Sequence, residues 1–554
     1  MKLSAEFARR TVKEVAAVLR RARWWILAVA VLCVCDQAIR ACAFSLPRSS
    51  AVALRCARLC LLYGAFSTAP VFLCGRFSRI LGPVLFGYWL LAELVQLWVL
   101  VNFNMALGGN WILMVFSTSG AEVREFASGF MTVGNILFAL LSFAAVAAVA
   151  RFFASPRREY PAPSRISVCL ALLCLALSWA MAVTSFRAPV SWAQISRDLL
   201  ALNLPADTAA NWSSYHALAS ACSSEPRFGL SVAGGAEKGP LCVFVIGEST
   251  ARSHMGIYGY RRDTTPELAA LAAEGGLAVF TDLTTTHPAT PEALCSLLTG
   301  CDLAASRSFP AVFPAMLKKA GYRTELVSCQ GSWQNKDVVG SHLFLSCGSR
   351  RFLQGGHVAG TLPDGVALPV VEEALADASG GLALFVHLYG CHNPATRRVP
   401  KDFRRQWPRD ASVASEKARR KVDSYDTAVA YDDYVVSSVI RAVAARGAPS
   451  FVFFVSDHGE SPDSAIWRDA KSRDTFEVPL MVWMSPEYRA AYPGTAARVE
   501  AARSRKLYMN QLIEGMLELA RVEGYRPWNS SGNFIAAEFV EAAPQNGKER
   551  GHAR

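Results

Sequence analysis

Five long apolar runs occupy the first third of the 554-residue chain, and they limit its possible folds more than any other feature. A helix needs about 20 predominantly apolar residues to cross the hydrocarbon core of a bilayer. The runs approach or reach that length, and polar connections separate them. The sequence therefore predicts a transmembrane domain with five helices over residues 1–186, at Trp24–Phe44, Ala57–Leu73, Ile80–Asn104, Met131–Phe153 and Ile166–Phe186.

The basic residues between these runs predict the orientation of the domain. Lysine and arginine in short loops remain on the cytoplasmic side of a membrane. They gather before the first run, after the second and after the fourth, so an odd number of spans places the rest of the chain outside. These loops carry Lys2, Arg9, Arg10, Lys13, Arg20, Arg21, Arg23, Arg76, Arg79, Arg151, Arg157, Arg158 and Arg165. They also explain much of the net charge of +12, so no nucleic-acid partner is expected.

Beyond the apolar runs, short β-rich segments alternate with amphipathic helical segments, which indicates an α/β domain with a largely parallel central sheet. We place this domain at residues 239–542, after a linker with short helices at 187–238 and before a disordered tail at 543–554. The expected strands are Leu241–Ile246, Arg323–Ser328, Leu382–Leu388, Ser450–Val455 and Val478–Trp483. The expected helices are Pro266–Glu274, Pro291–Leu298, Ala311–Ala320 and Ser415–Ala445.

Carboxylate and imidazole groups follow two of the expected strands. Glu248 comes after the first strand, and Asp457 and His458 come after Ser450–Val455. The carboxyl ends of parallel strands meet at one edge of a sheet, where ligands bind. Because these side chains are typical zinc ligands, the sequence predicts a zinc site formed by Glu248, Asp457 and His458.

The cysteines outside the apolar runs do not suggest a second zinc site, because none has Cys-x-x-Cys spacing. An extracytoplasmic domain would permit disulfides, and the close pairs are Cys295 with Cys301 and Cys329 with Cys347. Their connectivity cannot be deduced from the sequence.

Several motifs resemble those of the phosphoethanolamine transferases, in the alkaline phosphatase and sulfatase superfamily, which include enzymes that modify lipid A and confer polymyxin resistance. The resemblance rests on an ordered set of motifs: Val245–Tyr260 (VIGESTARSHMGIYGY), His387–Phe403, Tyr425–Asp426, Tyr431–Tyr434 and Ser456–Ser461. It extends to Ser117–Glu122 between the third and fourth apolar runs. It implies a five-helix transmembrane bundle followed by an alkaline phosphatase/sulfatase-like α/β domain.

The resemblance also implies an activity and a location. Such an enzyme is a monomer of the bacterial inner membrane with a periplasmic, Zn²⁺-dependent catalytic domain. It transfers phosphoethanolamine from phosphatidylethanolamine to an envelope glycolipid, lipid A or lipopolysaccharide core, through a phospho-threonine. Aligning Pro291 with the proline of the family selects Thr286 as nucleophile and metal ligand, with Thr284, Thr285 and Thr290 as alternatives. Zinc would lower the pKa of such a hydroxyl.

Other site residues follow from matching positions. His392 matches the histidine that contacts the transferred phosphate or protonates the leaving group, and Lys336 matches a phosphate-binding lysine. His387 lies deeper in its strand and is either substrate-binding or structural. Thr118 and Glu122 match the loop that binds the lipid donor. A histidine usual in the family is absent between Ser461 and Trp483, so we expect a cation from Arg468, Lys471 or Arg473 in its place.

Other functions fit the sequence less well. A phosphoglycerol transferase of the lipoteichoic acid or periplasmic glucan type is the near alternative, because it joins similar domains. A sulfatase would need cysteine or serine in a C/S-x-P/A-x-R context at the nucleophile. A transporter is disfavoured because the five runs show no paired halves. A catalytically dead sensor would be expected to lose a metal ligand.

Overall fold

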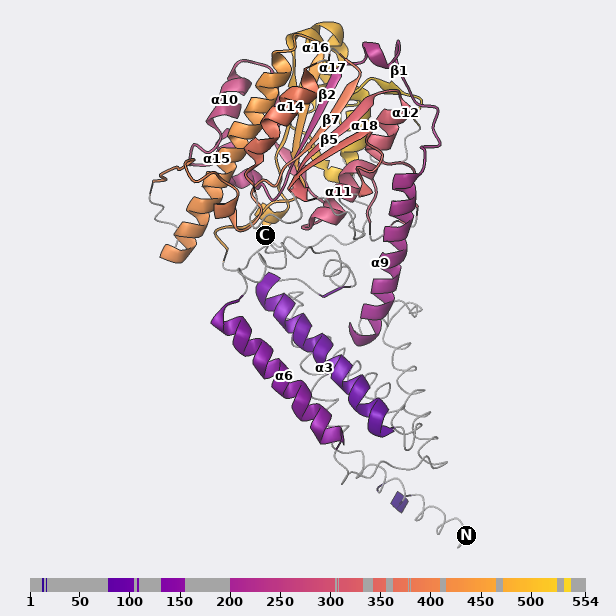
Figure 1. Cartoon of the computed structure of the whole chain (residues 1–554), viewed down its shortest axis with the longest axis vertical. Coiled ribbons are helices and arrows are strands. Elements are labelled where there is room, and N and C mark those ends of the chain that lie inside the picture. Colours follow the sequence, from indigo (N-terminus) through magenta and orange to yellow (C-terminus); the bar gives the residue numbers. More distant parts are fainter. Residues whose placement is uncertain are drawn as a thin grey trace. The chain divides into compact units, whose positions relative to one another are not determined.

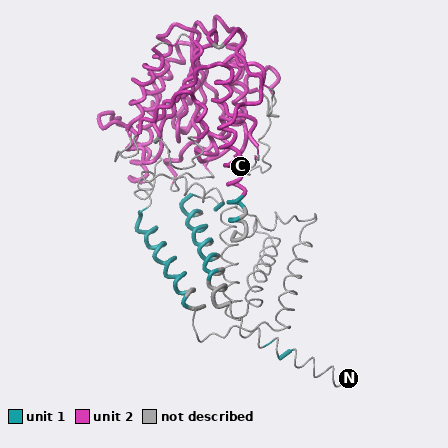
Figure 2. Tube along the Cα trace, turned by 45° about the vertical axis from the view of Figure 1, so that its right-hand side comes forward, with its two compact units in different colours: residues 1–112, 126–209 teal, residues 113–125, 210–554 magenta. Residues whose placement is uncertain are grey.

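The computed structural model divides the chain into two compact units, which Figure 2 colours separately. Residues 1–112 and 126–209 form unit 1, and residues 113–125 and 210–554 form unit 2. The structure describes residues 12–13, 16, 78–103, 107–108, 131–154, 200–303, 306, 308–331, 342–354, 362–376, 378, 380–408, 415–464, 472–525 and 533–539.

Two helices of unit 1 coincide with the third and fourth apolar runs. They are α3 (Ser78–Phe103) and α6 (Val133–Ala154). Polar side chains join them: Trp98 Nε1 donates to Asn135 Oδ1 at 3.2 Å, and Asn135 Nδ2 donates to Asn102 Oδ1 at 3.3 Å. The other three predicted runs lie outside the described residues. Among the helices that are described, none has both the length and the apolar character needed to cross a membrane, and the five-helix bundle stays a prediction.

Of the range predicted as a linker with short helices, residues 200–238 are described, and they contain one long helix besides the short helix η2 (Ala236–Lys238). Helix α9 (Leu200–Ser223) runs through the boundary between the two units. Pro205 lies inside this helix, in its second turn, where proline removes one backbone hydrogen bond. Leu218 and Cys222 near its end are buried in the core of unit 2, which stabilises the helix.

A seven-stranded sheet forms the centre of unit 2, in the order β3-β9-β8-β2-β7-β5-β6. Strand β9 pairs antiparallel with β8 and β3, whereas the other pairs are parallel, so the largely parallel sheet is confirmed. All five expected strands are present. The strands are β2 (Leu241–Gly247), β3 (Leu277–Phe280), β5 (Arg323–Gly331), β6 (Ser349–Gln354), β7 (Leu382–His387), β8 (Ser450–Ser456) and β9 (Leu480–Met484).

Helices cover both faces of this sheet (Figure 1). Alternate side chains of β2 enter two apolar cores, with Phe244 in one and Val243 in the other. On the Val243 face lie α10 (Pro266–Ala273), α14 (Leu368–Leu375) and α15 (Glu416–Ala444). On the Phe244 face lie α11 (Thr290–Thr299), α12 (Phe313–Lys319) and α18 (Leu512–Leu519).

Short elements complete unit 2. Two-stranded sheets pair β1 (Ser231–Val232) with β11 (Val522–Glu523), and β4 (Asp282–Thr284) with β10 (Lys506–Tyr508). The remaining helices are α16 (Pro486–Ala491), α17 (Pro493–Ala501), η2 (Ala236–Lys238), η3 (Arg252–His254), η4 (Gly256–Tyr258), η5 (Asp364–Ala367), η6 (Ala395–Arg397), η7 (Arg473–Thr475) and η8 (Met509–Gln511).

The cysteines of unit 2 are free thiols in this structure. Cys295 Sγ lies 3.8 Å from the carbonyl oxygen of Cys301, and Cys329 and Cys347 are both buried and unpaired. Neither of the two close pairs noted in the sequence forms a disulfide here.

The register of the central strands sets the level at which their loops begin. Ile246 of β2 is opposite His387 of β7, and Gly247 of β2 is opposite Ser456 of β8. The loops that start at Glu248, Leu388 and Asp457 therefore leave the sheet side by side, at its carboxyl edge.

Candidate metal centre

Glu248, Asp457 and His458 come together where β2 and β8 end. Each offers a ligand atom, and these atoms all lie within 4.8 Å of one another. His458 Nε2 is 3.2 Å from Glu248 Oε1 and 3.5 Å from Asp457 Oδ2. All three side chains are buried. The structure therefore assembles the three residues that the sequence selected as metal ligands.

The chemistry of this cluster fits a divalent cation. Asp457 Oδ2 is buried, and no hydrogen-bond partner for it exists among the described residues. Burial, and then the Glu248 carboxylate, raise the pKa of Asp457. Two buried carboxylates this close repel each other unless a cation or a proton lies between them. His458 Nδ1 lies 2.9 Å from the Gly459 carbonyl oxygen, which holds Nε2 toward the cluster.

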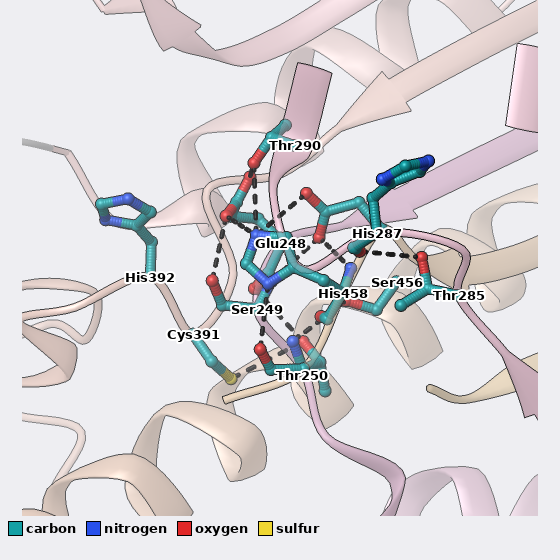
Figure 3. A network of polar contacts seen from close by, with 12 residues as sticks. Glu248, Ser249, Thr250, Thr285, His287, Thr290, Cys391, His392, Ser456 and His458 are labelled. Carbon is teal, nitrogen blue, oxygen red and sulfur yellow. Dashed lines mark hydrogen bonds and ion pairs between the residues drawn. The ribbon is translucent and has the colours of Figure 1, made fainter. Parts of the chain in front are cut away.

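The threonine beside the cluster is Thr290, not Thr286. Thr290 Oγ1 donates to Glu248 Oε2 at 2.9 Å and lies 3.3 Å from His458 Nε2 (Figure 3). Thr286 Oγ1 instead donates to Ser296 Oγ at 2.8 Å, on the side of α11. The prediction that Thr286 reaches the metal ligands is therefore wrong. Thr290 is the first residue of α11, directly before Pro291, whereas Thr286 lies in the loop before the helix, and its hydroxyl bonds to Ser296 of the helix.

The other two threonines of this tract are structural. Thr284 is the last residue of β4 and pairs with Tyr508 of β10. Thr285 is buried, and its hydroxyl lies 3.5 Å from the Met509 sulfur. Of the four alternatives left by the sequence, only Thr290 has a hydrogen bond to a metal-ligand candidate among the described residues.

His392 and His387 occupy different environments. His392 is partly exposed; in Figure 3 it lies to one side of the cluster. Its carbonyl accepts from Arg398 Nε at 2.8 Å, and its Nδ1 is 3.4 Å from Arg398 Nη2. His387 is buried against Phe344, and burial lowers its pKa to about 4, so it is neutral at physiological pH. This burial favours packing over substrate contact for His387.

The other predicted site residues are less well placed. Lys336, Thr118 and Glu122 lie outside the described residues, as do Arg468 and Lys471. Arg473 is described, but its side chain is 77% exposed and its Nε donates to Glu477 Oε1 at 2.6 Å. Arg473 is therefore a poor candidate for the cation expected near the phosphate.

Two residues that the sequence analysis missed hold Glu248 in place. Gln330 Nε2, near the end of β5, lies 3.4 Å from Glu248 Oε2 and 3.2 Å from the Leu388 carbonyl oxygen. Ser249 has a left-handed backbone (φ 61°), which lets its N–H reach Asp457 Oδ1 and its hydroxyl reach Glu248 Oε1. Searching the residues just beyond each predicted strand would have found both, since Gln330 follows the expected strand Arg323–Ser328.

The loop after β7 packs directly on the backbone of Glu248. Cys391 N–H donates to the Glu248 carbonyl oxygen at 2.9 Å. A Cβ at Gly390 would lie 2.5 Å from that same oxygen, and Gly390 has a φ of +51°. Only glycine fits this close approach, so the loop that carries His392 is fixed against the loop that carries Glu248.

Side chains of helix α15 form hydrogen bonds with the loops that follow β2 and β7. Tyr425 donates to the Ser249 carbonyl oxygen at 2.6 Å and accepts from the Ala251 N–H at 2.8 Å. Asp432 accepts from Thr250 Oγ1 at 2.8 Å and from Cys391 Sγ at 3.6 Å. Burial, and then Asp364, raise the pKa of Asp432 to about 8. The motif on α15 therefore positions the loop of Glu248 rather than binding the metal.

Asp426 of α15 organises the segment after this loop, and its loss should destabilise the fold. The buried carboxylate is 2.7 Å from His254 Nδ1, and it accepts from Tyr260 at 2.9 Å and Arg262 at 2.6 Å. We expect Asp426→Ala to lower the free energy of unfolding by about 3 kcal/mol, because it leaves the buried Arg262 without the carboxylate that balances its charge. Urea unfolding of the purified protein checks this, with the exposed Arg420→Ala as control. An unchanged midpoint would contradict it.

A parallel-rich sheet with a carboxylate–imidazole cluster at its carboxyl edge, and a threonine at an adjacent helix N-terminus, is the arrangement of an alkaline phosphatase/sulfatase-like α/β domain. The sulfatase family model matches residues 240–522. The chain belongs to the sulfatase family.

Its relatives narrow the resemblance to phosphoethanolamine transferases, as the motifs predicted. The chain is 26% identical over 508 residues to phosphoethanolamine transferase EptC of Escherichia coli K12, covering 85% of this chain and 86% of that protein. It is 30% identical over 261 residues to the Kdo(2)-lipid A phosphoethanolamine 7''-transferase of Salmonella typhimurium, covering 45% of each. These names give no support to the phosphoglycerol alternative.

Solved structures of phosphoethanolamine transferases are also similar to this chain. The C-terminal periplasmic domain of EptC from Escherichia coli, in complex with Zn, is 27% identical, with a TM-score of 0.51, covering 58% of this chain and 92% of that one. The integral membrane lipooligosaccharide phosphoethanolamine transferase A of Neisseria meningitidis is 17% identical, with a TM-score of 0.63, covering 91% of this chain and 96% of that one. The latter likeness concerns the fold alone.

Proposed function

We propose that this chain is a zinc-dependent phosphoethanolamine transferase, with phosphatidylethanolamine as donor and an envelope glycolipid as acceptor. The observation that carries the proposal is the position of Thr290, at the start of α11 and bonded to Glu248 beside His458. A hydroxyl in this position can act as nucleophile, and the names of the relatives supply the group that it would transfer.

Glu248, Asp457 and His458 would hold the zinc. When bound, zinc would lower the pKa of the adjacent hydroxyl and offset negative charge on the phosphoryl group. The N-terminus of α11 adds to this, because its free N–H groups and dipole favour an anion beside Thr290.

The transfer takes two displacements at phosphorus. In the first, Thr290 Oγ1, whose proton has passed to solvent, bonds to phosphorus as the bond to the diacylglycerol oxygen breaks, with His392 giving that oxygen a proton. In the second, a hydroxyl or phosphate oxygen of the glycolipid loses its proton, where it carries one, to His392 and bonds to phosphorus as the bond to Thr290 breaks. Arg398 fixes the backbone at His392 in both steps, because its Nε donates to the His392 carbonyl oxygen.

Incubation of the zinc-loaded full chain with phosphatidylethanolamine vesicles tests the function. We expect release of diacylglycerol and a phosphoethanolamine mass increment on the peptide that contains Thr290. Phosphatidylglycerol should give neither product. A phosphoglycerol increment instead would overturn the proposal in favour of the phosphoglycerol transferase.

The proposal includes a location in the bacterial inner membrane with the catalytic unit in the periplasm. If the chain has five spans with its N-terminus inside, a reporter fused after residue 200 should behave as periplasmic, because three arginine-rich loops stay in the cytoplasm. A reporter fused near Arg157 should behave as cytoplasmic. Alkaline phosphatase and fluorescent protein fusions measure this in cells. The opposite pattern would place the site across the membrane from its lipid donor and would contradict the predicted topology.

A further inference from the structure

Asp364, at the start of η5, lies outside every motif that the sequence analysis selected, yet it binds the turn that precedes His392. Its side chain is buried, with 2% of its surface exposed. The carboxylate accepts from the Tyr389 N–H at 2.9 Å and from the Gly390 N–H at 2.7 Å. Two successive backbone N–H groups therefore point at one carboxylate, which restricts the conformation of the turn after β7.

Both ends of this link are fixed. The next N–H along the turn, that of Cys391, donates to the Glu248 carbonyl oxygen at 2.9 Å. Next to Asp364, the Gly365 N–H donates to the Tyr431 hydroxyl of α15 at 3.2 Å. Asp364 is therefore an anchor for the turn, rather than a side chain that follows it.

Tyr389 connects this anchor to the imidazole of His392. The two rings meet edge to face, with centroids 5.3 Å apart, and the His392 N–H donates to the Tyr389 carbonyl oxygen at 3.3 Å. The Arg398 guanidinium lies over the Tyr389 ring, 4.0 Å from its centroid. The position of the His392 ring thus depends on Tyr389, and the backbone of Tyr389 is held by Asp364.

A carboxylate is suited to this position, because it can accept from both N–H groups at once. Burial raises the pKa of Asp364, whereas the Tyr389 and Gly390 N–H groups and Arg398 act in the opposite direction. An asparagine would accept through its oxygen alone and would turn its NH2 group toward the second N–H. Asp364→Asn should therefore preserve the size of the side chain and loosen the turn.

We propose that Asp364 is a positioning residue of the reaction, which holds the His392 imidazole, through Tyr389, where it can protonate the departing diacylglycerol oxygen. The inference rests on the proposed transferase function and adds a residue on which its acid step depends. In that step the bond from phosphorus to the diacylglycerol oxygen breaks, the electron pair stays on the oxygen, and the oxygen takes a proton from His392. A misplacement of about 1 Å can lower such a rate about 100-fold.

Two donors with different leaving groups separate this role from a general loss of structure. Phosphatidylethanolamine releases an alcohol oxygen that needs the proton, whereas para-nitrophenyl phosphoethanolamine releases nitrophenolate, which is stable as an anion near neutral pH. With zinc-loaded full chain in neutral detergent, we expect Asp364→Asn to lower kcat for phosphatidylethanolamine about 100-fold at unchanged KM. Release of nitrophenolate should be nearly unchanged. Zinc content should also be unchanged, since the register of β2 with β8 holds the ligands.

Asp433→Asn is the matched control. Asp433 is also buried and also accepts from two successive N–H groups, those of Glu267 at 3.0 Å and Leu268 at 2.9 Å. These groups belong to the first turn of α10 and not to the turn before His392. The control should lower the melting temperature as Asp364→Asn does, and it should affect the two donors equally.

A double variant gives an independent measure. If Asp364 acts through His392, Asp364→Asn should cause no further loss of phosphatidylethanolamine cleavage in His392→Ala protein. Asp364→Ser, which is smaller and keeps one acceptor oxygen, should show the same selective loss, and it replaces the asparagine variant where that variant folds poorly.

Equal slowing of both donors by Asp364→Asn would overturn the inference, and so would losses that multiply in the double variant. Loss of zinc from Asp364→Asn would also overturn it and assign Asp364 to the support of Glu248 alone. An unmodified enzyme that releases neither diacylglycerol nor nitrophenolate would instead contradict the proposed function, and with it this inference.

Discussion

Thr290→Ala should lower transfer roughly 10³-fold or more, while the protein still folds and binds zinc. The hydroxyl of Thr290 is the group bonded to Glu248 and adjacent to His458, and an alanine there leaves no atom to accept the phosphoryl group. Thr290→Ser should keep part of the activity, because it retains the hydroxyl. Diacylglycerol release from phosphatidylethanolamine, measured with zinc content, checks both variants.

Thr286→Ala is the matched control for this prediction. It removes a hydroxyl from the same loop, but that hydroxyl is bonded to Ser296. We expect a modest loss of stability and nearly full transfer. Activity that survives in Thr290→Ala and disappears in Thr286→Ala would return the nucleophile to the residue that the sequence alignment selected.

Asp457→Asn should abolish tight zinc binding, with a loss of affinity beyond the 10- to 100-fold typical of residues that only support a ligand. The reason is that Asp457 Oδ2 is buried, lies 3.5 Å from His458 Nε2 and has no hydrogen-bond partner among the described residues. An asparagine removes the charge and puts a poor ligand in its place. Metal analysis should show about one zinc per chain before the substitution and none after it.

Thermal unfolding gives a second measure of the same change. Removing zinc with a chelator should destabilise the unmodified protein by about 4 kcal/mol if zinc is present at 1,000 times its Kd. The chelator should have no effect on Asp457→Asn. Asp463→Asn, an exposed change on the following turn, serves as control. Full zinc occupancy in Asp457→Asn would exclude Asp457 as a ligand.

The sequence predicted the centre of the fold well, because buried parallel strands have a strong signature. Leu241–Ile246 and Ser450–Val455 are continuous apolar runs bounded by turn residues, and both became central strands within one residue of the expected ends. The edge strand β6 was missed, since Ser349–Gln354 is mostly polar and partly exposed. Its pairing with β5 comes from tertiary structure that no local pattern records.

The site was predicted to the level of motifs but not of individual hydroxyls. Glu248, Asp457 and His458 follow predicted strands, so the sheet itself brings them together. The choice between Thr286 and Thr290 depends on the path of the loop before α11, which decides which hydroxyl reaches Glu248. The beginning of the helix was predicted to within one residue, but no local pattern in the sequence fixes the conformation of this loop.

The metal ligands and the segment between β7 and α15 are held by different parts of the fold. The backbone register of β2 with β8 fixes the ligands, whereas the segment between β7 and α15 is anchored on α15 by Phe403 and Trp407. Sequence changes in that segment can therefore accumulate without moving the centre of the reaction. A lineage built on this domain can keep one phosphoryl chemistry while it explores new envelope molecules, and the exposed turns after His392 are where such divergence should be sought first.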